Sequence, residues 1–190
     1  MAGEEQHIIA KDGVERAKAW LEKTGRVGVQ YTVYEVGAVP FLTFSNVGGG
    51  DFSFDMCGTL HLDEGKAAFF GEIKKYNNVG SQPAEYKEYL AKCYRACVAH
   101  ARPYHFMWIT WHPFNQTNWT KLCTAGEVRE AVQTHSAIYC GAGVDVDDDI
   151  CERVASGLWL IVLSDRQEGL SMTNEQLGVL RAAEVGGVTP

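Results

Sequence analysis

Long hydrophobic runs are absent from this chain of 190 residues. No window reaches the roughly 18 apolar residues that a membrane-spanning helix needs. The N-terminal stretch MAGEEQHIIAKDGVERAK is also too acidic and too polar for a secretory signal. These absences argue against a membrane or secreted protein, and we expect the protein to lie in the cytoplasm.

Familiar metal and phosphate motifs are missing as well. The six cysteines form no C-x-x-C pair, so neither a zinc ribbon nor a disulfide framework is indicated. The glycines at 48–50 lack the lysine and hydroxyl residue of a P-loop, and the acids at 145–149 do not match an EF-hand. Cys93, Cys97 and His100 share one face of an expected helix, but they lack a fourth metal ligand, and core packing is the preferred interpretation.

The chain has no excess of positive charge either. Its net charge of −7 and its pI near 5.3 count against a protein that coats nucleic acid non-specifically. The charge is unevenly distributed, however. Residues 66–102 contain seven basic and three acidic residues, so this segment carries +4 and the remainder −11. Any anionic ligand is therefore expected along this segment.

Hydrophobic residues make up 46% and charged residues 22%, as in an ordinary globular protein. Residues 1–10 are expected to form a loose or partly ordered arm, and Asp12 is a candidate N-cap of the first helix. The hydrophobic patterns predict helices at 12–25, 81–102, 125–135, 150–156 and 174–183, and strands at 27–36, 39–45, 52–60, 66–75, 104–114 and 158–166. This order predicts a single α/β domain over residues 1–190, with a central mixed β-sheet flanked by helices.

Three chemically active side chains lie on two neighbouring strands of this prediction. The strands 52–60 and 66–75 are separated by a polar turn at 63–65 and can pair as a hairpin. Asp55 belongs to the first strand, whereas Glu72 and Lys74 belong to the second. Because side chains two residues apart leave the same face of a strand, Glu72 and Lys74 project together. The hairpin can therefore gather all three side chains at one point.

Two carboxylates and a lysine suit the hydrolysis of a phosphodiester bond. Asp55 and Glu72 offer hard oxygen ligands for Mg²⁺ or Mn²⁺, and the backbone carbonyl of Ile73 is a further candidate ligand. Lys74 can orient or deprotonate the attacking water, or it can stabilise the charged phosphate, and the sequence leaves both roles open. The plain alternative is a solvated Glu72–Lys74 pair on a surface hairpin. The apolar strand that precedes these residues favours a functional site, because an acid there is costly without a partner.

Three segments together resemble the PD-(D/E)XK nuclease superfamily, of the branch that includes RecB-like nucleases and Holliday-junction resolvases. FSFDMCG resembles the segment with the strand acid (Asp55), FFGEIKKY the acid-x-lysine segment (Glu72 and Lys74), and SQPAEYKEY the Q-x-x-x-Y element (Gln82 and Tyr86). The resemblance implies an αβββαβ core over about residues 12–112, with residues 113–190 as a C-terminal extension. VERAKAWLEKTG resembles the first helix of this superfamily, which implies Glu15 as a further metal ligand.

The resemblance implies a Mg²⁺- or Mn²⁺-dependent deoxyribonuclease that acts in restriction, repair or phage defence. DNA is then the expected partner, and a protein partner or a second copy can complete the substrate channel. The alternatives are a catalytically inactive nuclease-fold module that binds nucleic acid or a protein, and an unrelated α/β protein. The sequence departs from the pattern because no proline precedes Asp55, and because Asp51 lies on the same strand face as a rival ligand. Tyr104, Trp108 and Trp111 can stack on bases, although core packing is the preferred interpretation.

Overall fold

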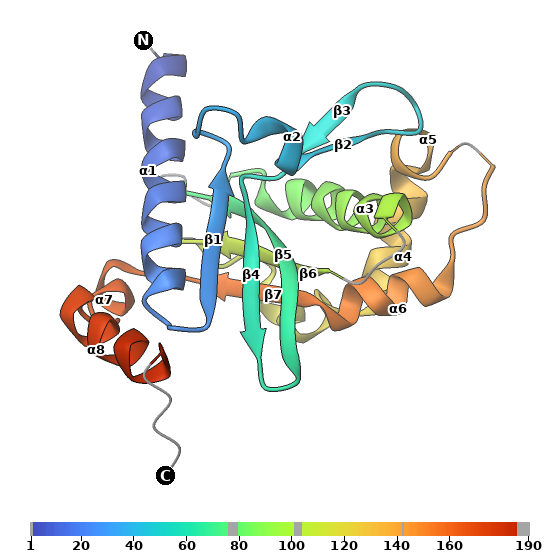
Figure 1. Cartoon of the computed structure of the whole chain (residues 1–190). Coiled ribbons are helices and arrows are strands. Elements are labelled where there is room, and N and C mark those ends of the chain that lie inside the picture. Colours follow the sequence, from blue (N-terminus) through green and yellow to red (C-terminus); the bar gives the residue numbers. More distant parts are fainter. Residues whose placement is uncertain (1, 76–79, 101–103, 142, 186–190) are drawn as a thin grey trace.

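The computed structural model describes residues 2–75, 80–100, 104–141 and 143–185. Its centre is a five-stranded mixed sheet in the order β1-β4-β5-β6-β7 (Figure 1). The strands are β1 (Val27–Thr32), β4 (Met56–Leu62), β5 (Gly65–Lys74), β6 (His105–Thr110) and β7 (Leu158–Val162). β4 runs antiparallel to β1 and β5, whereas β6 runs parallel to β5 and β7. The predicted α/β class and central mixed sheet are confirmed.

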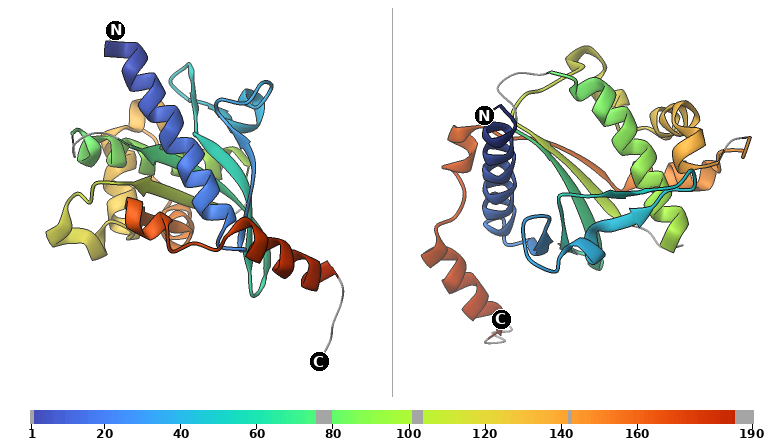
Figure 2. Two further views of the ribbon diagram at one scale, coloured as in Figure 1. Left: turned by 90° about the vertical axis from the view of Figure 1, so that its left-hand side faces the viewer. Right: turned by 90° about the horizontal axis from the view of Figure 1, so that it is seen from above.

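Helices cover both faces of the large sheet (Figure 2). On one face lies α1 (Ala2–Glu22), where Val14 and Ala17 share a buried cluster with Ile73 of β5. The other face is covered by α3 (Gln82–His100), α4 (Ala125–Thr134) and α6 (Asp148–Ser156). Each large apolar side chain buried in these layers contributes about 1.5–3 kcal/mol. The layers therefore fix β5 between α1 and α3.

A small second sheet lies beside the end of α3. It consists of β2 (Thr43–Ser45) and β3 (Asp51–Ser53), which pair antiparallel, and it follows the short helix α2 (Val39–Leu42). Phe44 packs against Phe52 and Phe70, and Arg95 of α3 donates a hydrogen bond to Ser45 O at 2.9 Å. Aromatic contacts and one hydrogen bond thus hold the small sheet to the core.

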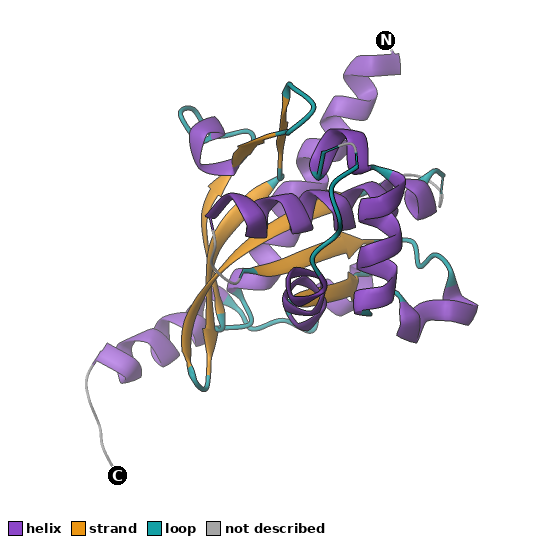
Figure 3. Ribbon diagram, turned by 90° about the vertical axis from the view of Figure 1, so that its right-hand side faces the viewer, coloured by secondary structure: helices purple, strands orange, loops and turns teal. Residues whose placement is uncertain are grey.

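Further helical segments lie outside the layers that cover the large sheet. They are η1 (Gln116–Lys121), α5 (Ser136–Tyr139), α7 (Asp165–Glu168) and α8 (Asn174–Val185), of which α8 projects from the body (Figure 3). A capping box begins α8, because Thr173 and Gln176 exchange backbone-to-side-chain hydrogen bonds. Within the described ranges, none of the helices has both the length and the apolar character needed to cross a membrane.

The first helix is longer than the sequence predicts. The expected loose arm at residues 1–10 is wrong, since α1 begins at Ala2. Glu4 and Glu5 lie near its start, where the helix dipole favours acids, and no proline or glycine interrupts residues 4–12. Asp12 is therefore not an N-cap. Its carboxylate accepts a hydrogen bond from Lys75, which follows β5.

The continuous strand expected at 52–60 is also wrong. β3 and β4 are separated by Phe54 and Asp55, and they belong to different sheets. Apolar side chains recur at every second residue on both sides of this break, so the pattern could not reveal it. The chain changes sheets at Asp55, and this acid lies between two strands rather than inside one.

Several other boundaries differ from the prediction. Three strands end earlier than expected, at Thr32, Thr110 and Val162. The segment 39–45 is a helical turn followed by a short strand, because Pro40 fits the start of α2. β7 is the last strand of the sheet, and Trp159 is 40% exposed. The helices predicted near 81–102, 125–135, 150–156 and 174–183 are confirmed with small shifts of their ends.

Close contact between β1 and β4 leads to a stability prediction. A Cβ atom at Gly58 would lie 2.1 Å from the carbonyl oxygen of Gly28, which cannot move without disturbing β1. We expect Gly58→Ala to lower the free energy of unfolding by about 1–3 kcal/mol, measured by urea denaturation. Gly28→Ala is the matched control, because its Cβ meets nothing within 4 Å. Equal denaturation midpoints for the two variants would contradict the prediction.

Candidate functional site

Asp55 contacts β5 through two hydrogen bonds. Its backbone N–H donates to Gly71 O at 2.9 Å, and its Oδ2 accepts from the backbone N–H of Ile73 at 2.7 Å. β4 begins at Met56, opposite Gly71, so no β4 backbone group reaches Ile73. The carboxylate of Asp55 accepts the hydrogen bond from Ile73 in place of a backbone carbonyl of β4. The chain break described above therefore positions this acid beside the E-x-K segment.

Glu72 and Lys74 project from the same face of β5, as predicted. Lys74 Nζ lies 2.9 Å from Glu72 Oε1 and 5.4 Å from the centre of the Trp108 ring. Both side chains are largely buried, and the second carboxylate oxygen of Glu72 has no hydrogen-bond partner among the described residues. A buried carboxylate oxygen without a partner is costly, and a bound cation would remove that cost.

The two acids lie close enough to influence each other. Burial, and then the negative charge of Glu72, raise the pKa of Asp55 to about 7. The hydrogen bond from Ile73 and the positive charges of Lys74 and Lys92 act in the opposite direction without cancelling the effect. A cation bound beside Asp55 would favour its ionised form.

The rival acid Asp51 lies apart from this group. It is exposed on β3 and accepts a hydrogen bond from Ser45 Oγ at 2.8 Å. Asp55 is the one of the two that contacts β5.

Glu15 also lies outside the contact between Asp55 and Glu72. Its side chain is 66% exposed, and its ion-pair partner is Lys11 at 3.8 Å. The α1 acid that reaches the end of β5 is Asp12, which binds Lys75. Sequence similarity to a first helix could not distinguish these two acids, because their difference depends on the rotation of α1 against the sheet.

Gln82 and Tyr86 are buried and engaged within the protein. Gln82 Oε1 accepts from Thr110 Oγ1 at 2.7 Å, and its Nε2 donates to His112 O at 3.3 Å. The Tyr86 hydroxyl donates to Leu122 O at 2.8 Å. These bonds tie the start of α3 to the end of β6 and to the segment before α4. A direct contact of either side chain with substrate stays a prediction.

Glu85 is a charged neighbour of the site that the sequence analysis did not identify. It lies in the first turn of α3, and its Oε2 is 3.1 Å from Lys74 Nζ. Its other oxygen accepts a hydrogen bond from Ser81 Oγ. The pairing of Ser81 with an acid one helical turn later was the available signal. Such pairs are common at helix starts, so the spacing alone does not single out Glu85 as a site residue.

The aromatic side chains proposed for base stacking divide into two groups. Tyr104 and Trp108 are buried in the core, which confirms the packing interpretation for both. Trp111 is partly exposed and lies between the Arg16 guanidinium and the Lys75 ammonium, at 5.5 and 5.6 Å from its ring centre. It is available for stacking only beside these two cations.

A clasp joins α1 to α7 next to Trp111. Arg16 binds both Asp165 and Glu168, and Trp111 Nε1 donates to Glu168 Oε1 at 2.8 Å. These bonds, and the neighbouring acids, raise the pKa of Arg16 above its usual value. The clasp lies on the face of the large sheet that α1 covers.

The alternative metal site is not supported. Cys93 and Cys97 are buried in the core, and the Nδ1 atom of His100 contacts the Tyr104 hydroxyl at 2.5 Å. Across the part of the chain that the structure describes, no group of three or more His, Cys, Asp or Glu side chains is arranged to hold a metal ion. Any cation at Asp55 and Glu72 would therefore need water, backbone or substrate oxygens as further ligands.

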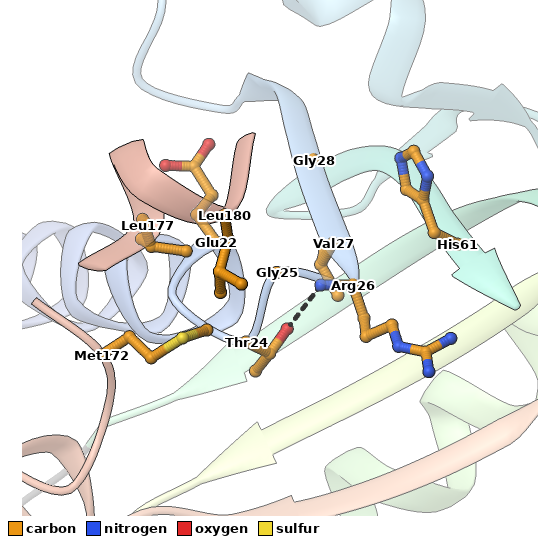
Figure 4. Close-up of a pocket in the computed structure, with 10 residues that line it drawn as sticks. All are labelled: Glu22, Thr24, Gly25, Arg26, Val27, Gly28, His61, Met172, Leu177 and Leu180. Atoms are coloured by element: carbon orange, nitrogen blue, oxygen red, sulfur yellow. Dashed lines mark hydrogen bonds between the residues drawn. The ribbon is translucent and has the colours of Figure 1, made fainter. Parts of the chain in front are cut away.

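Three cavities lie away from these acids. One is bordered by the end of α1, the start of β1 and α8, and its lining includes Arg26, His61 and Leu177 (Figure 4). The other two adjoin β7 and also share lining residues with the first, among them Thr24. Asp55, Glu72 and Lys74 line none of the three.

Comparison of the chain with protein-family models, curated proteins and solved structures found no match.

The raised pKa of Asp55 predicts how stability depends on pH. A carboxyl group that is harder to ionise in the folded state stabilises the fold at low pH, and this stabilisation is lost as the pH rises. We expect the contribution of Asp55 to the free energy of unfolding to fall as the pH rises from about 4 to about 7, by at most ~1.4 kcal/mol per pH unit. Urea denaturation of the wild type and of Asp55→Asn across this range measures it.

The part of the change in unfolding free energy with pH that is due to Asp55 should be absent from Asp55→Asn. Above pH 7 this variant should be more stable than the wild type. The matched control is Asp51→Asn, which keeps Asp55 and should keep the slope. An unchanged slope in Asp55→Asn would contradict the prediction.

Proposed function

We propose that this protein is a metal-dependent nuclease of the PD-(D/E)XK type that hydrolyses phosphodiester bonds in DNA. The observation that carries the proposal is the contact between Asp55 and the E-x-K segment. Asp55 binds the backbone of Ile73, and this residue lies between Glu72 and Lys74. Two acids and a lysine are thereby placed together at one end of β5.

The donor set fits Mg²⁺ or Mn²⁺. Glu72 has a buried oxygen without a hydrogen-bond partner within the described residues, and Asp55 is ionised with difficulty beside it. Asp55, Glu72 and the Ile73 carbonyl would hold the cation, with water and phosphate oxygens as the remaining ligands. Bound there, the cation supplies positive charge that polarises the phosphate and lowers the pKa of water.

Lys74 is the side chain that would contact the attacking water or the phosphate. Its ammonium group is held by Glu72 and Glu85 and lies against Trp108. From this place it can orient the attacking water or stabilise negative charge on the phosphate. Gln82 and Tyr86 support it indirectly, because they fix the start of α3. The segment 66–102 carries a net charge of +4 in the sequence, which supports contact with a DNA backbone, although Lys75 and Lys87 also pair with Asp12 and Glu130.

We propose that this activity serves restriction, repair or defence against foreign DNA in the cytoplasm. The acidic remainder of the chain is a poor surface for a long duplex, so a protein partner or a second copy would complete the DNA channel.

The second candidate is a nuclease-fold module that binds DNA or a protein without cleaving. It is favoured by the position of Glu15, which lies away from Asp55 and Glu72 and so is not the further metal ligand that the resemblance implies, and by the ion pairs that already neutralise Lys74. Such a module would bind its partner without a divalent cation.

Cleavage assays on single- and double-stranded DNA test the proposed function. With Mg²⁺ or Mn²⁺ we expect cleavage, and we expect Asp55→Ala, Glu72→Gln and Lys74→Ala each to reduce the rate at least about 100-fold. Asp51→Ala and Glu15→Ala are the matched acid controls and should retain most of the activity. Cleavage that survives Asp55→Ala and Lys74→Ala would exclude this site. DNA binding without cleavage in any metal would favour the second candidate.

A further inference from the structure

The ammonium group of Lys74 is shared between two acids from different elements. Glu72 Oε1 of β5 lies 2.9 Å from Nζ, and Glu85 Oε2 of α3 lies 3.1 Å from it on the other side. Lys74 is 15% exposed and Glu85 27% exposed, so this contact is partly shielded from water. The centre of the Trp108 ring lies 5.4 Å from the same ammonium group. Lys74 therefore bridges the candidate metal site and the first turn of α3.

Glu85 is itself fixed in place. Ser81 Oγ donates a hydrogen bond to its Oε1, which leaves Oε2 directed at Lys74. The first turn of a helix favours a carboxylate, because the helix dipole is positive there. Gln82, one turn earlier, is anchored to the end of β6 through Thr110. Glu85 thus lies on a helix whose start is anchored to β6, and Ser81 in the preceding turn holds its Oε1.

We propose that Glu85 is a positioning residue that holds Lys74 when a divalent cation occupies Asp55 and Glu72. This inference rests on the proposed function and adds a residue to it. A cation at Glu72 and an ammonium group 2.9 Å from the same carboxylate repel each other. Lys74 must then move away from Glu72, and Glu85 is the anion that receives it. Lys74 stays beside the site instead of turning out to solvent.

The same geometry gives Glu85 an effect on cation affinity. Without Glu85, Lys74 keeps only Glu72 of these two acids and competes with the cation for it. With Glu85, the competition is relieved, because the lysine has a second carboxylate within reach. The effect of Glu85 on cation binding therefore passes through Lys74. An ordinary surface salt bridge, worth about 0–1 kcal/mol, would have no such dependence.

A double-mutant cycle on Mn²⁺ affinity, measured by isothermal titration calorimetry, tests this inference. The proteins are the wild type, Glu85→Gln, Lys74→Met and the double variant. We expect Glu85→Gln to weaken Mn²⁺ binding about tenfold, which corresponds to about 1.4 kcal/mol, and we expect Lys74→Met to strengthen it. In the Lys74→Met background, Glu85→Gln should change the affinity by less than about threefold.

Glu130→Gln is the matched control. It removes one carboxylate that pairs with a lysine of α3, Lys87, but does not touch Lys74. Its Mn²⁺ affinity should equal that of the wild type.

The outcomes separate this inference from the proposed function. Equal effects of Glu85→Gln with and without Lys74 would overturn the positioning role alone, because Glu85 would then act only as a distant charge. Wild-type protein that binds no Mn²⁺ would overturn the proposed function and this inference together. Circular dichroism of all variants confirms that the fold is retained.

Discussion

The candidate site depends on one hydrogen bond, which the backbone N–H of Ile73 donates to Asp55 Oδ2. This bond fixes the point at which the chain leaves the small sheet and enters the large one. It also offsets part of the cost of placing Asp55 beside a second acid, because a backbone donor favours the ionised carboxylate. Asp55 and Glu72 still repel each other when both are ionised. A cation bound between them would reduce this repulsion.

The sequence predicted the layers and the hairpin well, and the reason is periodicity. The apolar run in 66–75 and the helical stripe of 81–102 are local signals that survive in the folded protein. The change of sheet at Asp55 was missed because the alternation continues through it. The extent of α1 was missed because Asp12 looks like a cap, although its actual partner is Lys75, which is distant in sequence.

The site itself could be predicted only in part, for a similar reason. Glu72 and Lys74 are neighbours by strand geometry, so their pairing follows from their spacing. Glu85 joins them only through the packing of α3 against β5, which no local pattern records. The choice between Asp51 and Asp55 also required the three-dimensional structure, since both lie on the same side of an ideal strand.

The clasp between Arg16 and α7 has a consequence for the order of folding. Arg16 and Glu168 are separated by 152 residues, so their contact closes almost the whole chain. Contacts of such long range carry a large loop-closure cost and form after local ones. We therefore expect the clasp to form after the β4–β5 hairpin. Since α1 packs against the strand that carries Glu72 and Lys74, we also expect the site to become rigid only after α7 has docked.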